Sequence, residues 1–73
     1  MRTVMEHVGM EQLGVDLRKI RLERDLTQAK VAEMTGIKQS HLSMIERGKR
    51  TPTLDNVLVL CVALNAELRI VAH

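Results

Sequence analysis

Residues 27–48, TQAKVAEMTGIKQSHLSMIERG, decide the fold of this chain. The stretch repeats an interval of four residues at Gln28, Ala32 and Gly36. The interval places the small side chain of Ala32 where a second helix can cross closely over the first. Gly36 can take the positive φ of a tight turn. Apolar residues placed to fill the space between the two helices are Val31, Ile37, Leu42 and Ile45. The stretch therefore predicts two short helices that cross at a steep angle.

Capping residues inside and after this stretch set the limits of the helices. Thr27 and Thr53 are good N-cap residues, and Gly48 and Asn65 can take the left-handed conformation that ends a helix. Apolar spacing in the N-terminal part of the chain adds one more helix before Asp25. The expected helices span about 10–24, 28–35, 38–47 and 54–64.

The composition limits the class of protein. A chain of 73 residues without Phe, Trp or Tyr forms one domain with an aliphatic core. Cys61 is the only cysteine, so no intrachain disulfide forms, and we expect a reducing, cytoplasmic location. The three histidines lack a second cysteine at zinc-like spacing, and the longest apolar run, 57–64, is too short to cross a membrane. We therefore expect no metal, no cofactor and no membrane contact.

The two ends of the chain differ from the helical part. Residues 1–9 have no clear period and are expected to form an N-terminal arm. Residues 10–65 form the expected helical domain, and 66–73 form a C-terminal segment with partly alternating polarity that predicts a short strand. The chain offers this strand no clear second strand, so the expected partner is the same strand of a second copy.

Charge is concentrated in one stretch. The formal net charge is only +2. Between residues 38 and 50, however, four cations, Lys38, Arg47, Lys49 and Arg50, stand against the single anion Glu46. A basic strip on a nearly neutral protein indicates a localised contact with phosphate groups.

The segment from Leu17 to Leu64 resembles the lambda-repressor/Cro-like (Xre-type) helix-turn-helix family. The resemblance depends on LTQ at 26–28, IERGKR at 45–50 and PTL at 52–54, in register with Ala32 and Gly36. It implies an all-α domain of four to five helices, followed here by the short strand that pairs across a homodimer. It also implies sequence-specific binding to double-stranded DNA at a palindromic operator, with the second of the two short helices in the major groove.

The resemblance also assigns roles to individual positions. The expected contacts to DNA bases come from Lys38, Gln39, Ser40, Ser43 and Met44. The expected contacts to DNA phosphates come from Thr27, Gln28, His41, Lys49 and Arg50. Arg21 and Glu46 match a pair that forms a structural salt bridge between helices. Three alternatives stay open: Lys38 is a solvated side chain, His41 faces solvent, and Met44 is partly exposed instead of touching a thymine methyl.

The fourth helix and the tail suggest an association surface. The expected core face of that helix consists of Leu54, Val57, Leu58, Cys61 and Leu64. Val59 and Val62 are apolar where the family commonly has charge, and together with Leu68 and Ile70 they form the expected dimer or partner surface. The alternative is that Val59 and Val62 are tolerated surface valines without a partner. The ending 64–71 resembles the HipB-type antitoxin branch, in which a C-terminal strand pairs across a two-fold axis.

These observations support one main function and leave others open. The main hypothesis is a transcriptional repressor that is the autoregulating antitoxin of a type II toxin–antitoxin pair and also binds a toxin protein. The alternative is a stand-alone phage-type regulator or restriction–modification controller without a toxin partner. A third possibility is a helical protein-binding module that has lost DNA binding. Because the sequence shows no catalytic arrangement of side chains, we expect the protein not to be an enzyme.

Overall fold

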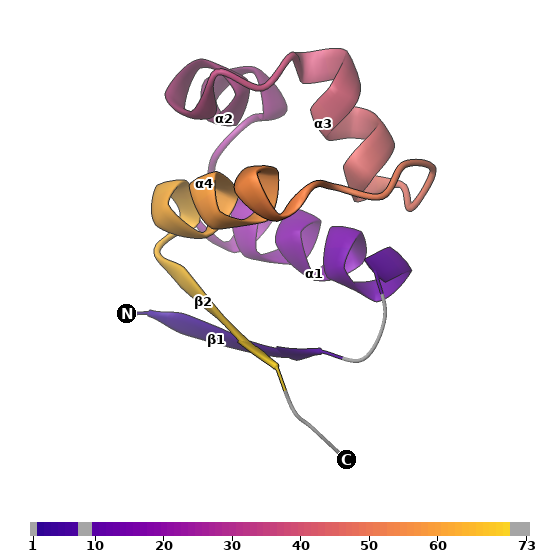
Figure 1. Cartoon of the computed structure of the whole chain (residues 1–73). Helices are drawn as coiled ribbons and strands as arrows, with labels where there is room; N and C mark the ends of the chain where they lie inside the picture. Colours follow the sequence, from indigo (N-terminus) through magenta and orange to yellow (C-terminus); the bar gives the residue numbers. More distant parts are fainter. Residues whose placement is uncertain (1, 8–9, 71–73) are drawn as a thin grey trace.

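The computed structural model describes residues 2–7 and 10–70. In these ranges the elements follow one another as β1 (Thr3–His7), α1 (Met10–Glu23), α2 (Gln28–Thr35), α3 (Gln39–Glu46), α4 (Leu54–Leu64) and β2 (Ala66–Ile70). Figure 1 shows α1 and α4 as a central layer, with α2 and α3 on one side of it and the two strands on the other. The α2–α3 unit and the sheet therefore occupy opposite sides of the domain.

Local capping interactions explain where the helices begin and end. The Thr27 and Thr53 hydroxyls accept hydrogen bonds from the backbone amides of the third residue of α2 and of α4, at 3.0 and 3.1 Å. Gly36, with φ of 77°, ends α2, and Asn65, with φ of 52°, ends α4. Gly48 also has a positive φ, 70°, one residue beyond the C-cap of α3. All four expected helices are confirmed to within one residue at each end.

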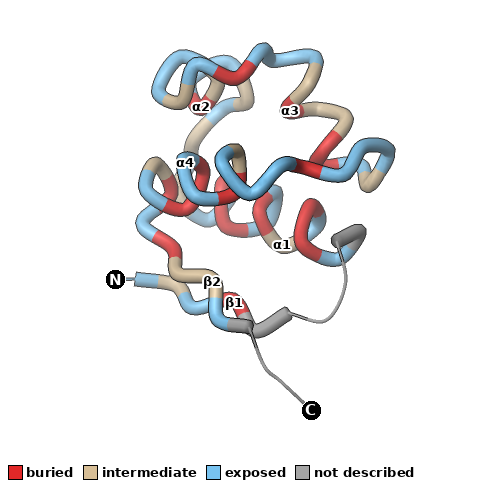
Figure 2. The backbone as a smooth tube through the Cα atoms, viewed as in Figure 1, coloured by how far each residue is buried: buried red, intermediate tan, exposed pale blue. Residues whose placement is uncertain are grey.

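The core lies between the four helices, is built mainly of aliphatic side chains, and extends to one residue of each strand (Figure 2). The residues expected between the two crossing helices are buried: Val31, Ile37, Leu42 and Ile45. The core face expected for α4 is partly wrong. Leu54 and Leu58 are 66% and 52% exposed, and Leu60 is fully buried instead. Both faces of α4 are apolar, so the sequence pattern did not show which one packs inward.

The strand expected at the C-terminal end is confirmed, but its partner was not foreseen. Residues 3–7 form β1, which pairs in parallel with β2, and Thr3 lies opposite Ala66. The expectation that the chain offers no second strand is therefore wrong, and β2 does not need a second copy for its pairing. Part of the segment expected to be an arm is instead a strand of the folded domain. Residues 1, 8–9 and 71–73 of the expected terminal segments lie outside the described residues.

Arg24 connects this sheet to the helices. Its guanidinium donates to the Leu64 carbonyl at 3.0 Å, to the Asn65 carbonyl at 3.3 Å and to the Thr3 hydroxyl at 2.9 Å. A cation at the C-terminal end of a helix satisfies carbonyls that have no partner within the helix. One side chain from the end of α1 thus holds the end of α4 against the start of β1.

Gly14 lets α1 approach α3 closely. A Cβ atom placed on Gly14 would lie 2.0 Å from the carbonyl oxygen of Ile45, at the end of α3. No side chain fits there, because real Cβ contacts are almost never shorter than 3.0 Å. The position of α3 relative to the core therefore depends on this glycine inside α1.

Candidate nucleic-acid interface

The α3 helix has one buried face and one polar face. Leu42, Ile45 and Glu46 are buried. At the start of the helix Gln39 and Ser40 are exposed, while His41, Ser43 and Met44 are half-buried. This division follows the helical period of about 3.6 residues per turn. The base-contacting residues expected on α3 thus share one accessible side of the helix.

A buried ion pair fixes the orientation of that helix. Arg21 of α1 donates from Nε to Glu46 Oε2 at 2.7 Å and from Nη2 to Oε1 at 2.9 Å. Its Nη1 atom also donates to the Leu26 carbonyl at 2.7 Å. The two charged side chains are 8% and 2% exposed. Such a two-pronged contact specifies geometry as well as energy, because the planar guanidinium matches the carboxylate.

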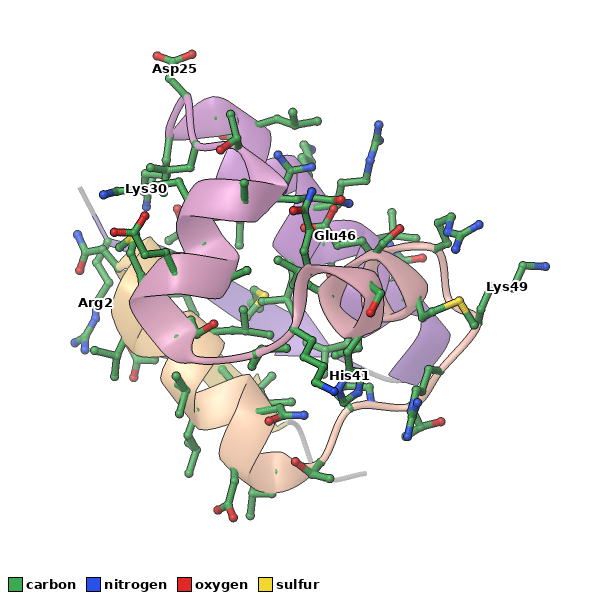
Figure 3. All side chains as sticks on the ribbon, turned by 90° about the horizontal axis from the view of Figure 1, so that it is seen from above. Arg2, Asp25, Lys30, His41, Glu46 and Lys49 are labelled. Carbon is green, nitrogen blue, oxygen red and sulfur yellow. The ribbon has the colours of Figure 1, made fainter. Side chains whose placement is uncertain are left out.

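Gln28 at the start of α2 completes this arrangement. Its side-chain amide donates to Glu46 Oε1 at 3.0 Å, so a single carboxylate joins α1, α2 and α3. Figure 3 shows Glu46 among the helices, away from the outer surface. The anion counted within the basic strip is therefore buried and paired. The exposed charges of the strip are all positive: Lys38, Arg47, Lys49 and Arg50.

The first turn of α3 is open to a ligand. Lys38 is the N-cap residue, with extended backbone, and its side chain makes no capping hydrogen bond. Lys38, Ser40, His41, Met44 and Arg50 line one surface hollow between α3 and the loop that follows it. Residues expected to contact bases and residues expected to contact phosphates thus meet at one site.

The other expected phosphate-contacting residues come from two separate parts of the chain. The Thr27 hydroxyl caps α2, and Gln28 is half-buried beside it. Lys49 and Arg50 are exposed in the loop after α3. Figure 3 shows Lys49 extending outward from that loop, on the opposite side of the domain from Lys30. The candidate interface therefore takes its expected phosphate contacts from the start of α2 as well as from the basic loop after α3.

The expected association surface lies away from α3. Val59 is 40% and Val62 83% exposed on α4. Leu68 packs partly against the core and lines a hollow with Leu58 and Val62. The side chain of Ile70 lies outside the described residues. The surface on α4 also includes Leu54 and Leu58, which the sequence pattern had assigned to the core.

Two features are absent from residues 2–7 and 10–70. No group of three or more His, Cys, Asp or Glu side chains there could hold a metal ion. No helix in the same ranges combines the length and the apolar character that a membrane span requires.

Comparison with known proteins gives a matching family model and two sequence relatives. A family model described as "Helix-turn-helix" matches residues 17–71. The HTH-type transcriptional regulator y4dJ of Sinorhizobium fredii is 38% identical over 52 residues, which cover 71% of this chain and 68% of the relative. The control protein C.SmaI of Serratia marcescens is 31% identical over 58 residues, which cover 80% and 69%.

Solved structures agree in fold. The restriction-modification controller protein C.AhdI of Aeromonas hydrophila is 34% identical with a TM-score of 0.75, over 80% of this chain and 88% of that one. The clp gene regulator ClgR of Corynebacterium glutamicum is 30% identical with a TM-score of 0.78, over 86% and 67%. With its four helices and short C-terminal strand, the chain belongs to the lambda-repressor-like (Xre-type) helix-turn-helix family of DNA-binding transcriptional regulators.

Proposed function

We propose that this protein is a stand-alone, homodimeric transcriptional regulator of the controller type, which binds a palindromic operator through α3. The observation that carries the proposal is the polar face of α3, held by the Arg21–Glu46–Gln28 network and bordered by exposed cations. A fixed helix lets short side chains meet base edges in a constant register. The phosphate-contacting residues position the domain, and the base-contacting residues supply sequence preference.

In the proposed complex, the first turn of α3 enters the major groove and α2 crosses the DNA backbone. Gln39 is exposed in that first turn, and its amide suits the N6 and N7 atoms of adenine. Lys49 and Arg50 would contact phosphates beside the groove. The negatively charged backbone then meets only the positive members of the strip, because Glu46 is neutralised inside the domain.

A second copy is the proposed occupant of the apolar stripe on α4. Leu54, Leu58 and Val62 follow one another at intervals of four residues and are all more than half exposed. A stripe of this kind is unfavourable in water and is typical of an association surface. The longest extent of one protomer is 36 Å. This size is compatible with two protomers whose α3 helices lie about one DNA turn, roughly 34 Å, apart, as a palindromic operator requires.

The relatives favour the controller function over the antitoxin function that was the main hypothesis. C.SmaI is a control protein, and C.AhdI is a restriction-modification controller protein. The HipB-type branch and the toxin partner stay predictions. Their motivation is the C-terminal strand and the apolar stripe, but β1 of the same chain pairs with the strand, and a second copy of this chain accounts for the stripe equally well.

Two experiments test the proposal. The first measures binding of the purified protein to a duplex from upstream of its own gene and to a scrambled duplex of equal composition. A preference for the first duplex is expected. Equal affinity for both would contradict sequence-specific regulation. The Gln39→Ala, Lys49→Ala double variant is the control. If its affinity for DNA is unchanged, either other residues bind the DNA or the protein is a protein-binding module that has lost DNA binding.

The second experiment separates the controller from the antitoxin. The chain is expressed alone and together with the product of the adjacent gene, and the mass of each species is measured by light scattering after gel filtration. A homodimer in both cases is expected. A stable mixed complex, with a neighbour that is harmful when expressed alone, would overturn the stand-alone function in favour of the antitoxin.

A further inference from the structure

Arg47, directly after the last turn of α3, is an exposed cation of the basic strip, but it is not among the residues expected to contact individual bases or phosphates. Its side chain folds back along the helix. Nε donates to the Ser43 carbonyl at 3.4 Å, and Nη2 donates to Met44 Sδ at 3.2 Å. These two contacts hold the guanidinium over the preceding turn instead of letting it extend into the loop.

This position lies on the base-contacting side of α3. Residues three and four apart share one face of a helix, so Arg47 lies in line with Ser43 and Met44. Helical side chains also lean toward the helix N-terminus, which here is the end that enters the groove. The phosphate-contacting cations, Lys49 and Arg50, come from the loop instead. The guanidinium therefore lies against Met44, one of the side chains expected to contact bases.

We propose that Arg47 is a further specificity-determining residue, which recognises a guanine in each half-site of the operator, and that Met44 is its positioning residue. A guanidinium has more N–H donors than the two contacts to Ser43 and Met44 engage. Its planar fork matches guanine O6 and N7 in the major groove. Holding the side chain in place beforehand lowers the entropy lost on binding. This inference rests on the proposed function.

The test is selection of binding sites from randomised duplexes by the wild-type protein and by Arg47→Lys, Arg47→Ala and Met44→Leu. Lysine keeps the positive charge but lacks the fork that pairs with two acceptors. The expected result is that Arg47→Lys and Arg47→Ala lose the preference for guanine at one position per half-site. The other positions keep their preferences. The loss should be about 5- to 150-fold in relative affinity for that base. Met44→Leu should lose part of the same preference.

Lys49→Ala is the matched control, because it removes one cation of the same strip without touching α3. It should weaken binding to all sequences alike. If Arg47→Ala behaves in the same uniform way and keeps every base preference, Arg47 contacts a phosphate and the inference is wrong. If Arg47→Lys retains the guanine preference, the guanidinium does not pair with two acceptors of the base, and the inference is also wrong. Failure of the wild-type protein to select any sequence would overturn the proposed function itself.

Discussion

Replacing Gly14 by alanine tests the close approach of α1 to α3. From helix propensity alone, Gly14→Ala inside α1 should stabilise the domain by about 0.8–1.0 kcal/mol. The structure predicts the opposite sign, because the added Cβ would lie 2.0 Å from the Ile45 carbonyl oxygen and 3.0 Å from the carbonyl carbon. Ordinary contacts begin at 3.4 Å. The two helices must therefore move apart, since both contacted atoms belong to the backbone.

The size of the effect follows from these two opposing contributions. Overpacking a well-packed core costs about 1–3 kcal/mol, and occasionally more. A clash with a backbone carbonyl belongs at the upper end, because no flexible side chain can give way. After the propensity gain is subtracted, Gly14→Ala should lower the free energy of unfolding by about 2 kcal/mol. For a domain of this size, the melting temperature should then fall by roughly 8–16 °C.

The assay is thermal and urea unfolding followed by circular dichroism. Val15→Ala is the matched control, because Val15 is the next residue of α1 and is 50% exposed. It should change the unfolding free energy by no more than about 0.5 kcal/mol. A Gly14→Ala protein as stable as the wild type, or more stable, would refute the close approach. Because Ile45 lies in the last turn of α3, the variant should also bind operator DNA more weakly at a temperature where it is still folded.

Three further predictions concern the ion pair, the interface and the cysteine. Glu46→Ala leaves the buried Arg21 without its partner and should lower the free energy of unfolding, measured in urea, by about 3–5 kcal/mol. A loss below about 1 kcal/mol would mean that the pair is solvated. Gln39→Ala should cost about 1–3 kcal/mol of binding free energy on the operator and relax the preference at one base position. Lys49→Ala should weaken binding to all sequences and lower the slope of log affinity against log salt concentration by about one. Titrations at several salt concentrations would show whether the two roles are reversed. Burial raises the pKa of the Cys61 thiol above its ordinary value of 9.0, so the stability due to the neutral thiol is present below about pH 9 and is lost as the pH rises further. Ellman's reagent should accordingly react slowly with the native protein and rapidly in urea, and equal rates would contradict the burial.

Features that depend on neighbouring residues could be predicted from the sequence. Thr27 and Thr53 cap their helices, and Gly36 and Asn65 end theirs with positive φ, as expected. Each of these features is a hydrogen bond or a backbone preference within a few residues. The two crossing helices were equally predictable, because the interval from Gln28 to Gly36 and the apolar residues around it specify the packing locally.

Features that depend on distant segments could not be predicted. Arg24 is one of several charged residues near the end of α1, and only the fold brings the α4 carbonyls and Thr3 within its reach. Arg47 belongs to a basic strip in the sequence, and only its contacts with Ser43 and Met44 distinguish it from the loop cations.

The sequence by itself determined the four helices, the tight turn between α2 and α3, and the membership of the helix-turn-helix family, because these depend on spacing and capping along the chain. The tertiary structure decided three other features: the pairing of β1 with β2, the need for glycine at position 14, and which apolar face of α4 remains exposed. Each joins segments far apart in the chain. Neither the partner of a strand nor a backbone that crosses close to a helix leaves a periodic pattern in the sequence of the segment that it contacts.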